Sequence, residues 1–158
     1  MDKKLKEQLS RIKLLICDID GVLTDGSFIK STSGDELRSF NALDGVGFVM
    51  LRLLDLNIKT AWITGRESLT TTQRSEELQI DDVYNGVIRK IDAYNELKKK
   101  YELSDSEVCF IGDDIIDIPI LEKVGFAVTV PNAPKYIFNY AHYTTAVEGG
   151  KGAVREVI

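Results

Sequence analysis

Two aspartates directly after a short apolar run are the residues of this chain best suited to chemistry. The segment Lys13–Cys17 is typical of a buried strand, and Asp18 and Asp20 follow it with one residue between them. Because alternate side chains of an extended chain share a face, we expect the two carboxylates to lie close together. They repel each other unless a cation or a proton lies between them, so the pair suits chemistry on a phosphate. A solvated turn, in which Asp and Gly simply fit, is the alternative interpretation.

Other polar residues are expected at the ends of neighbouring strands. Thr64 follows a predicted second strand, and Lys90 opens the helix after a predicted third strand. Asp113 and Asp114 follow a predicted fourth strand. Parallel sheets bind ligands beyond the carboxyl ends of their strands, so this shared position indicates one site.

Strand and helix patterns alternate along the chain and predict the elements that position these residues. Strands are expected at 13–17, 58–63, 82–84, 107–111 and 126–130, with an edge strand at 143–144; helices are expected near 5–12, 44–56, 90–101 and 116–123, and between Arg66 and Leu78. Such alternation requires right-handed crossovers. We therefore expect an α/β fold, a Rossmann-like three-layer sandwich with a mainly parallel sheet.

Two local expectations can be checked against the structure. Segments 26–30 and 36–40 flank a Gly-containing stretch, 31–35, which predicts a small β-hairpin flap. Asp44 is expected to cap the helix 44–56. The helical spacing places five apolar side chains on its buried face: Val46, Val49, Met50, Leu53 and Leu54.

The composition limits the class of protein. The chain has 158 residues, a formal net charge of −5, 44% hydrophobic and 28% charged residues. We expect one domain over 1–158. The net negative charge argues against a nucleic-acid partner, which usually needs a basic patch. No apolar run approaches the roughly 20 residues that span a bilayer, and the charged start lacks a secretory pattern, so we expect a cytoplasmic protein with no membrane partner. Cys17 and Cys109 are interpreted as small core residues.

The residues at the strand ends resemble, in order and spacing, the four motifs of the haloacid dehalogenase superfamily of phosphotransferases. The resemblance covers nearly the whole chain, and its first and last motifs are the specific ones. The motifs are Asp18-x-Asp20-Gly21-Val22-x-Thr24-Asp25, Thr64-Gly65-Arg66, Lys90, and Gly112-Asp113-Asp114-x-x-Asp117.

The resemblance implies a Mg²⁺-dependent phosphatase. Asp18 would be nucleophile and metal ligand, Asp113 a second ligand, and Asp20 would bind the metal through its backbone carbonyl. The Asp20 carboxyl would be the general acid and base, an arrangement that favours hydrolysis over storage of a phosphoenzyme. Thr64 would bind a phosphoryl oxygen, and Lys90 would place positive charge beside Asp18.

Two further aspartates of the last motif would act without touching the metal. Asp114 would order the ligands or a metal-bound water. Asp117 has two interpretations that the sequence leaves open, namely support of the loop after the fourth strand or simple capping of the following helix.

The motifs leave no room for an inserted cap domain, so the site would be covered by another subunit or would accept a macromolecule. Four other segments resemble, within the superfamily, the family of 3-deoxy-D-manno-octulosonate 8-phosphate phosphatases. That resemblance implies a homotetramer and a role in lipopolysaccharide sugar biosynthesis. The segments are Ile63–Arg66, Tyr84–Gly86, Gly112–Pro119 and Gly149–Glu156.

Four basic residues are candidates for binding the carboxylate of a sugar-acid substrate. Arg66 and Arg74 could form paired hydrogen bonds with it, and a flexible Gly149-Gly150 turn could present Lys151 and Arg155, in this or a neighbouring site. Alternative functions are a phosphatase for a nine-carbon, sialic-type ulosonate 9-phosphate, a protein phosphatase, and a non-catalytic partner of a sugar-nucleotide synthetase.

Overall fold

The computed structural model describes residues 3–34 and 36–158. Six strands form one sheet in the order β5-β4-β1-β6-β7-β8, and every pairing in it is parallel. The mainly parallel sheet expected from the sequence is therefore confirmed. The strands are β1 (Leu14–Cys17), β4 (Lys59–Ile63), β5 (Asp82–Tyr84), β6 (Val108–Ile111), β7 (Phe126–Thr129) and β8 (Tyr143–Thr144).

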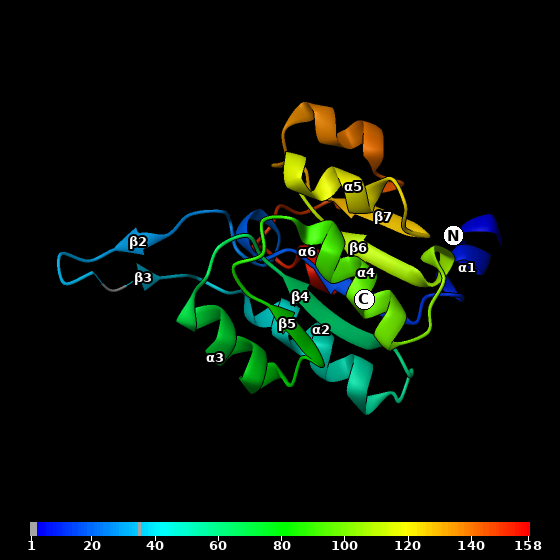
Figure 1. Cartoon of the computed structure of the whole chain (residues 1–158), viewed down its shortest axis with the longest axis horizontal. Helices are drawn as coiled ribbons and strands as arrows, with labels where there is room; N and C mark the ends of the chain where they lie inside the picture. Colours follow the sequence, from blue (N-terminus) through cyan, green and yellow to red (C-terminus); the bar gives the residue numbers. More distant parts are fainter. Residues whose placement is uncertain (1–2, 35) are drawn as a thin grey trace.

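Helices connect the strands and cover both faces of the sheet (Figure 1). The α-helices are α1 (Lys3–Leu9), α2 (Ala42–Leu53), α3 (Leu69–Leu78), α4 (Lys90–Lys100), α5 (Ile118–Leu121) and α6 (Ala153–Val157). Other helical turns are η1 (Ile19–Leu23), η2 (Asp105–Glu107), η3 (Ile115–Asp117) and η4 (Lys135–Tyr140). Among the described helices, none is long and apolar enough to cross a membrane.

Alternation along β1 divides the core into two layers. Leu14 and Ile16 pack in one buried cluster with side chains of α4, and Leu15 and Cys17 pack in the other with Phe48 of α2. Burying both faces of the central strand explains why this segment is apolar at every position. Cys17 is a free, buried thiol, as is Cys109 in the same cluster, which confirms the interpretation of both as core residues.

The strand order changes direction at β1. The chain first builds outward through β4 and β5, then returns to the other side of β1 to add β6 and β7. The loops after β1, β4 and β6 thus converge at one edge of the sheet, where such folds bind ligands.

The predicted hairpin is present as β2 (Ile29–Lys30) paired antiparallel with β3 (Glu36–Leu37). It projects from the body of the molecule, at the left of Figure 1, and the described chain forms no separate cap domain. Asp35, in the predicted loop of this hairpin, lies outside the described residues.

The predicted cap of α2 is wrong, and so is most of its predicted buried face: Val46 and Leu54 are exposed, while Val49 and Met50 are half-buried. Asn41, not Asp44, caps the helix by accepting from the Leu43 amide at 2.8 Å, and Leu53 is 79% exposed. The face that packs inward is instead Asp44, Gly45, Gly47, Phe48 and Leu51. Two contacts set this rotation: Phe48 meets the Trp62 ring edge-on, with centroids 5.7 Å apart, and Gly47 leaves room for α6.

The predicted flexible turn at Gly149-Gly150 is packed against the loop that follows β1. The Gly150 amide donates to the Val22 carbonyl and the Gly149 amide to Asn132 Oδ1, both at 2.9 Å. A Cβ placed on Gly149 would lie 1.7 Å from the Gly21 carbonyl oxygen. The C-terminal segment therefore supports the turn beside Asp18, and only glycine fits at this contact.

Replacing Gly149 by alanine is expected to destabilise the protein by about 2 kcal/mol or more, because two backbone segments must separate. Gly65→Ala is the matched control: its added Cβ would meet only ordinary contacts, the nearest at 3.5 Å, so we expect a change within about 0.5 kcal/mol. Urea unfolding of both variants measures the difference. Equal stability of the two variants would contradict the close packing of Gly149.

Candidate active site

A cleft of about 280 Å³ lies at the carboxyl edge of the central strands. It is bordered by residues that follow β1 and β4, by the start of α4, and by the loop after β6. The lining residues are Asp18, Asp20, Thr64, Gly65, Arg66, Ile88, Lys90, Asp114 and Ile116. The topology thus brings together polar residues that are far apart in the sequence, as the strand-end pattern predicted.

The turn η1 carries the chain away from Asp18 with a sharp change of direction. Gly21 has a φ of 99°, in the left-handed region that favours glycine. A Cβ there would lie 2.0 Å from Asp113 Oδ2. Gly21 therefore allows the loop after β1 to lie directly against the loop after β6.

Lys90, the first residue of α4, is buried between two carboxylates. Its Nζ lies 2.6 Å from Asp18 Oδ1 and 2.7 Å from Asp117 Oδ1. Burial alone would lower the pKa of Lys90, but the charges of Asp18 and Asp117 outweigh it and raise the pKa above its ordinary value. Lys90 is therefore a fixed positive charge beneath the cleft.

Both carboxylate oxygens of Asp117 are already engaged. Oδ1 accepts from Lys90, and Oδ2 accepts from the backbone amides of Asp113 at 2.9 Å and Asp114 at 3.1 Å. Asp117 is fully buried, and its bond to the Asp114 amide forms one half of the cap of η3. The geometry favours support of the loop: Asp117 holds the amides of Asp113 and Asp114, whereas its side chain makes no capping bond to the following helix α5.

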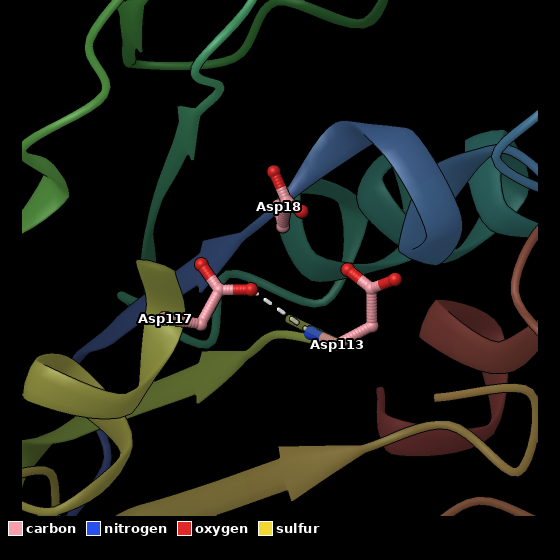
Figure 2. Close-up of side chains that lie close together, drawn as sticks. All are labelled: Asp18, Asp113 and Asp117. Carbon is pink, nitrogen blue, oxygen red and sulfur yellow. Dashed lines mark hydrogen bonds between the residues drawn. The ribbon is translucent and has the colours of Figure 1, made fainter. Parts of the chain in front are cut away.

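Three carboxylates converge below the cleft (Figure 2). Oxygens of Asp18, Asp113 and Asp117 lie within 4.8 Å of one another, and Asp113 Oδ1 is buried with no hydrogen-bond partner in the described part of the chain. Such a set of hard oxygens suits a divalent cation. Because Asp117 has no free oxygen, Asp18 and Asp113 are the side chains available to hold it.

Asp113 and Asp18 resist ionisation at this site. Burial, reinforced by the charges of Asp18 and Asp117, raises the pKa of Asp113 to about 9. Burial also raises the pKa of Asp18, to about 6, although Lys90 opposes the shift. A bound cation would reverse this tendency by favouring the charged forms.

Asp20 and Thr64 are in contact at the cleft. Thr64 Oγ1 donates to Asp20 Oδ2 at 3.4 Å and accepts from the Arg66 amide at 3.2 Å. Asp114 lies at the exposed side, where its Oδ1 accepts from the Ile115 amide and from the Tyr136 hydroxyl.

The four basic candidates are not brought together. Arg66 lines the cleft, pairs with Glu36 at 3.3 Å and stacks on the Phe28 ring at 3.9 Å. The other three do not line the cleft of their own chain: Arg74 pairs with Glu77 on α3, Arg155 contacts Met50 on α2, and Lys151 is exposed at the start of the C-terminal segment.

Two residues that touch the site were not predicted from the sequence. Arg38, at the base of the hairpin, lies 3.1 Å from Asp20 Oδ1, and Asn132 bonds both to the Gly21 carbonyl and to the Gly149 amide. The sequence marks Arg38 only by its charge and by its place after the first motif. No local pattern marks Asn132, because its partners come from distant segments.

Known proteins are similar to this chain in sequence and in fold. The family model of haloacid dehalogenase-like hydrolases matches residues 50–158. The chain is 40% identical over 151 residues to 3-deoxy-D-manno-octulosonate 8-phosphate phosphatase KdsC of Yersinia pestis, covering 96% of this chain and 80% of that protein. It is 41% identical over 146 residues to KdsC of Escherichia coli strain K12, covering 92% and 77%.

Two solved structures extend the comparison. A 3-deoxy-D-manno-octulosonate 8-phosphate phosphatase from Moraxella catarrhalis, in complex with a magnesium ion, a phosphate ion and a KDO molecule, matches with a TM-score of 0.94 at 35% identity, covering 99% of this chain and 89% of that one. The cobalt-bound enzyme of Haemophilus influenzae matches with a TM-score of 0.89 at 35% identity, covering 95% and 86%.

The chain belongs to the haloacid dehalogenase-like hydrolase family, and the expected enzyme class, a phosphoric monoester hydrolase, is confirmed. Within that family the relatives above are 3-deoxy-D-manno-octulosonate 8-phosphate phosphatases, so the resemblance noted in the sequence is confirmed as well.

Without a divalent cation, the protein is expected to lose stability as the pH rises from roughly 6 to 9. Because the pKa of Asp113 is raised to about 9, the folded chain keeps a proton in this window that the unfolded chain has lost. Stability falls with pH wherever the folded state binds more protons. Thermal unfolding in EDTA measures this slope, and added Mg²⁺ should raise Tm more at pH 8 than at pH 6.

Asp113→Asn should flatten the slope, whereas Asp55→Asn, at an exposed aspartate after α2, should leave it unchanged. The same slope in the wild type and in Asp113→Asn would show that the raised pKa of Asp113 is wrong.

Proposed function

We propose that this chain is a Mg²⁺-dependent phosphatase that hydrolyses 3-deoxy-D-manno-octulosonate 8-phosphate in lipopolysaccharide sugar biosynthesis. One observation carries the chemistry: Asp18 lies beside both Lys90 and Asp113 in a cleft at the carboxyl end of the sheet. The substrate is supported by relatives of that name at about 40% identity and by the related structure that holds magnesium, phosphate and KDO.

Asp18 is the proposed nucleophile. Lys90 pairs with its Oδ1, which leaves Oδ2 to attack phosphorus. As that bond forms, the bond from phosphorus to the sugar oxygen breaks, and the Asp20 carboxyl gives its proton to the departing oxygen. The products of this step are an aspartyl-phosphate on Asp18 and the free sugar acid.

A water molecule then attacks the phosphorus of the intermediate. Asp20, now a carboxylate, takes the proton of this water, so that phosphate is released and Asp18 is restored. The Thr64 hydroxyl would bind a phosphoryl oxygen, and Lys90 would offset the charge that gathers there. Asp117 would keep Lys90 and the Asp113 loop in place.

The residues below the cleft fit a magnesium ion. Asp18 and Asp113 would hold it with the Asp20 backbone carbonyl, since Asp113 Oδ1 is buried without a partner in the described chain. When bound, the ion offsets the negative charges of the phosphate and of Asp18 as they approach each other.

The proposal includes a homotetramer in which neighbouring copies cover the sites. Apolar side chains near the cleft support it: Ile88 at the rim is 71% exposed, and Ile29 and Leu37 of the hairpin are 66% and 60% exposed. Arg74, Lys151 and Arg155 would then contribute to substrate binding only from such an assembly. A cytoplasmic location stays a prediction from the sequence.

Asp18→Asn should lower kcat at least about 10³-fold while the protein still folds, because the amide cannot form the acyl phosphate. The measurement is phosphate release with Mg²⁺ from a set of sugar-acid and sugar phosphates, alongside circular dichroism. Wild-type activity retained by Asp18→Asn would exclude the nucleophile assignment. No release from any sugar phosphate by the wild type would favour the non-catalytic partner.

Arg66→Met should raise KM for the eight-carbon sugar-acid phosphate about 10- to 100-fold and should change KM for p-nitrophenyl phosphate, which has no carboxylate, less than about threefold. Arg89→Met, at an exposed arginine paired with Asp92, is the control and should leave both values unchanged. Wild-type kcat/KM on the nine-carbon phosphate, measured alongside, decides between the two sugar acids.

A further inference from the structure

A chain of alternating charges links the hairpin to the cleft. Arg38 lies 3.1 Å from Asp20 Oδ1 and 3.0 Å from Glu36 Oε1, and Glu36 in turn pairs with Arg66. Thr71, on α3, accepts from Arg38 Nη1 at 3.3 Å. Arg38 therefore contacts the loop after β1, the hairpin and α3 at once.

The side chain of Arg38 is 0% exposed, although it lies at the base of a projecting hairpin. A buried guanidinium is costly unless carboxylates compensate it, and its planar shape fixes the position of the groups it contacts. Its Nη2 has no hydrogen-bond partner among the described residues, and Arg38 does not line the cleft. It is therefore placed to act on Asp20 and not directly on a substrate.

The two oxygens of Asp20 have different surroundings. Oδ1 is buried and faces Arg38 as an ion pair without an aligned hydrogen bond. Oδ2 lies on the side of Thr64, which lines the cleft. Holding Oδ1 in this way orients Oδ2 toward the position of the leaving oxygen.

We propose that Arg38 is a positioning residue for Asp20, and that through it the hairpin sets the efficiency of proton transfer to the leaving group. This inference rests on the proposed phosphatase function. In the assisted step the proton leaves Asp20 Oδ2 for the departing alkoxide, while the Asp18–phosphorus bond forms and the phosphorus–alkoxide bond breaks. Arg38 neither gains nor loses a proton in this step.

The test compares leaving groups. An alkoxide needs a proton to depart, whereas p-nitrophenolate leaves as a stable anion. Formation of the aspartyl-phosphate, which kcat/KM reports, therefore depends on the position of Asp20 for the sugar phosphate and not for p-nitrophenyl phosphate, although both intermediates are hydrolysed with Asp20 as the base. Arg38→Met should lower kcat/KM for 3-deoxy-D-manno-octulosonate 8-phosphate about 30- to 100-fold, and for p-nitrophenyl phosphate less than about threefold. Arg38→Lys, which keeps the charge, should recover most of the loss.

A double variant separates positioning from direct substrate contact. In the Asp20→Asn background, Arg38→Met should change kcat/KM for the sugar phosphate less than about twofold, because its effect passes through Asp20. Arg52→Met is the matched control, since Arg52 bonds the Leu78 carbonyl away from the cleft; both substrates should react as in the wild type.

Equal losses of kcat/KM on both substrates in a folded Arg38→Met protein would overturn the proposal, and so would no loss on either substrate. It would also be overturned if Arg38→Met lowered kcat/KM as much in the Asp20→Asn background as in the wild type. If Arg38→Met does not fold, Arg38→Gln, which also removes the charge, takes its place with the same expected losses. If the proposed sugar-acid substrate is wrong, any primary alkyl phosphate that the wild type hydrolyses takes its place in the test. A wrong substrate can therefore be distinguished from a wrong role for Arg38.

Discussion

Lys90 lies between two buried carboxylates, Asp18 and Asp117, and this ion cluster determines the arrangement of the rest of the site. A buried charge without a partner is strongly unfavourable, so each member of the cluster needs the others. Asp117 extends the cluster by holding the amides of the loop that carries Asp113. One lysine nevertheless cannot compensate three carboxylates, and burial, together with the charges of Asp18 and Asp117, raises the pKa of Asp113. A divalent cation is the simplest group that balances the remaining negative charge.

Support for this cluster comes from parts of the chain that carry no catalytic group. Gly21 lets the first loop lie against Asp113, and Gly149 lies against the Gly21 carbonyl from the other side. Asn132 holds both glycines through its side-chain amide. The turn beside Asp18 is thus fixed between the fourth motif and the C-terminal segment. On its open side, Arg38 and Glu36 connect Asp20 to the hairpin, so the flap and the acid/base group form one network.

The topology and the central residues could be predicted from the sequence because they depend on patterns that the backbone enforces. Polar residues directly after apolar strands must gather at one edge of a parallel sheet, and Asp18, Thr64, Lys90 and Asp113 do so. The face of α2 could not be predicted in this way. Its apolar residues allow several rotations, and the packing of Phe48 on Trp62 and the approach of α6 select one. The same uncertainty of rotation explains why Arg74 and Arg155, both on helices, do not reach the cleft of their own chain.

Asp18 is the proposed acceptor of the phosphoryl group, and every later step of the reaction follows from this role. The direct measurement uses Asp20→Asn protein with p-nitrophenyl phosphate and Mg²⁺. The aspartyl-phosphate can still form, because p-nitrophenolate needs no proton to leave. It should then accumulate, because its hydrolysis lacks the Asp20 base. After acid quench, borohydride reduction and peptide mass mapping, the account predicts conversion of Asp18 to homoserine, in an amount that matches the first burst of p-nitrophenolate. Release of p-nitrophenolate with Asp18 unmodified, or modification of a different carboxylate, would contradict it.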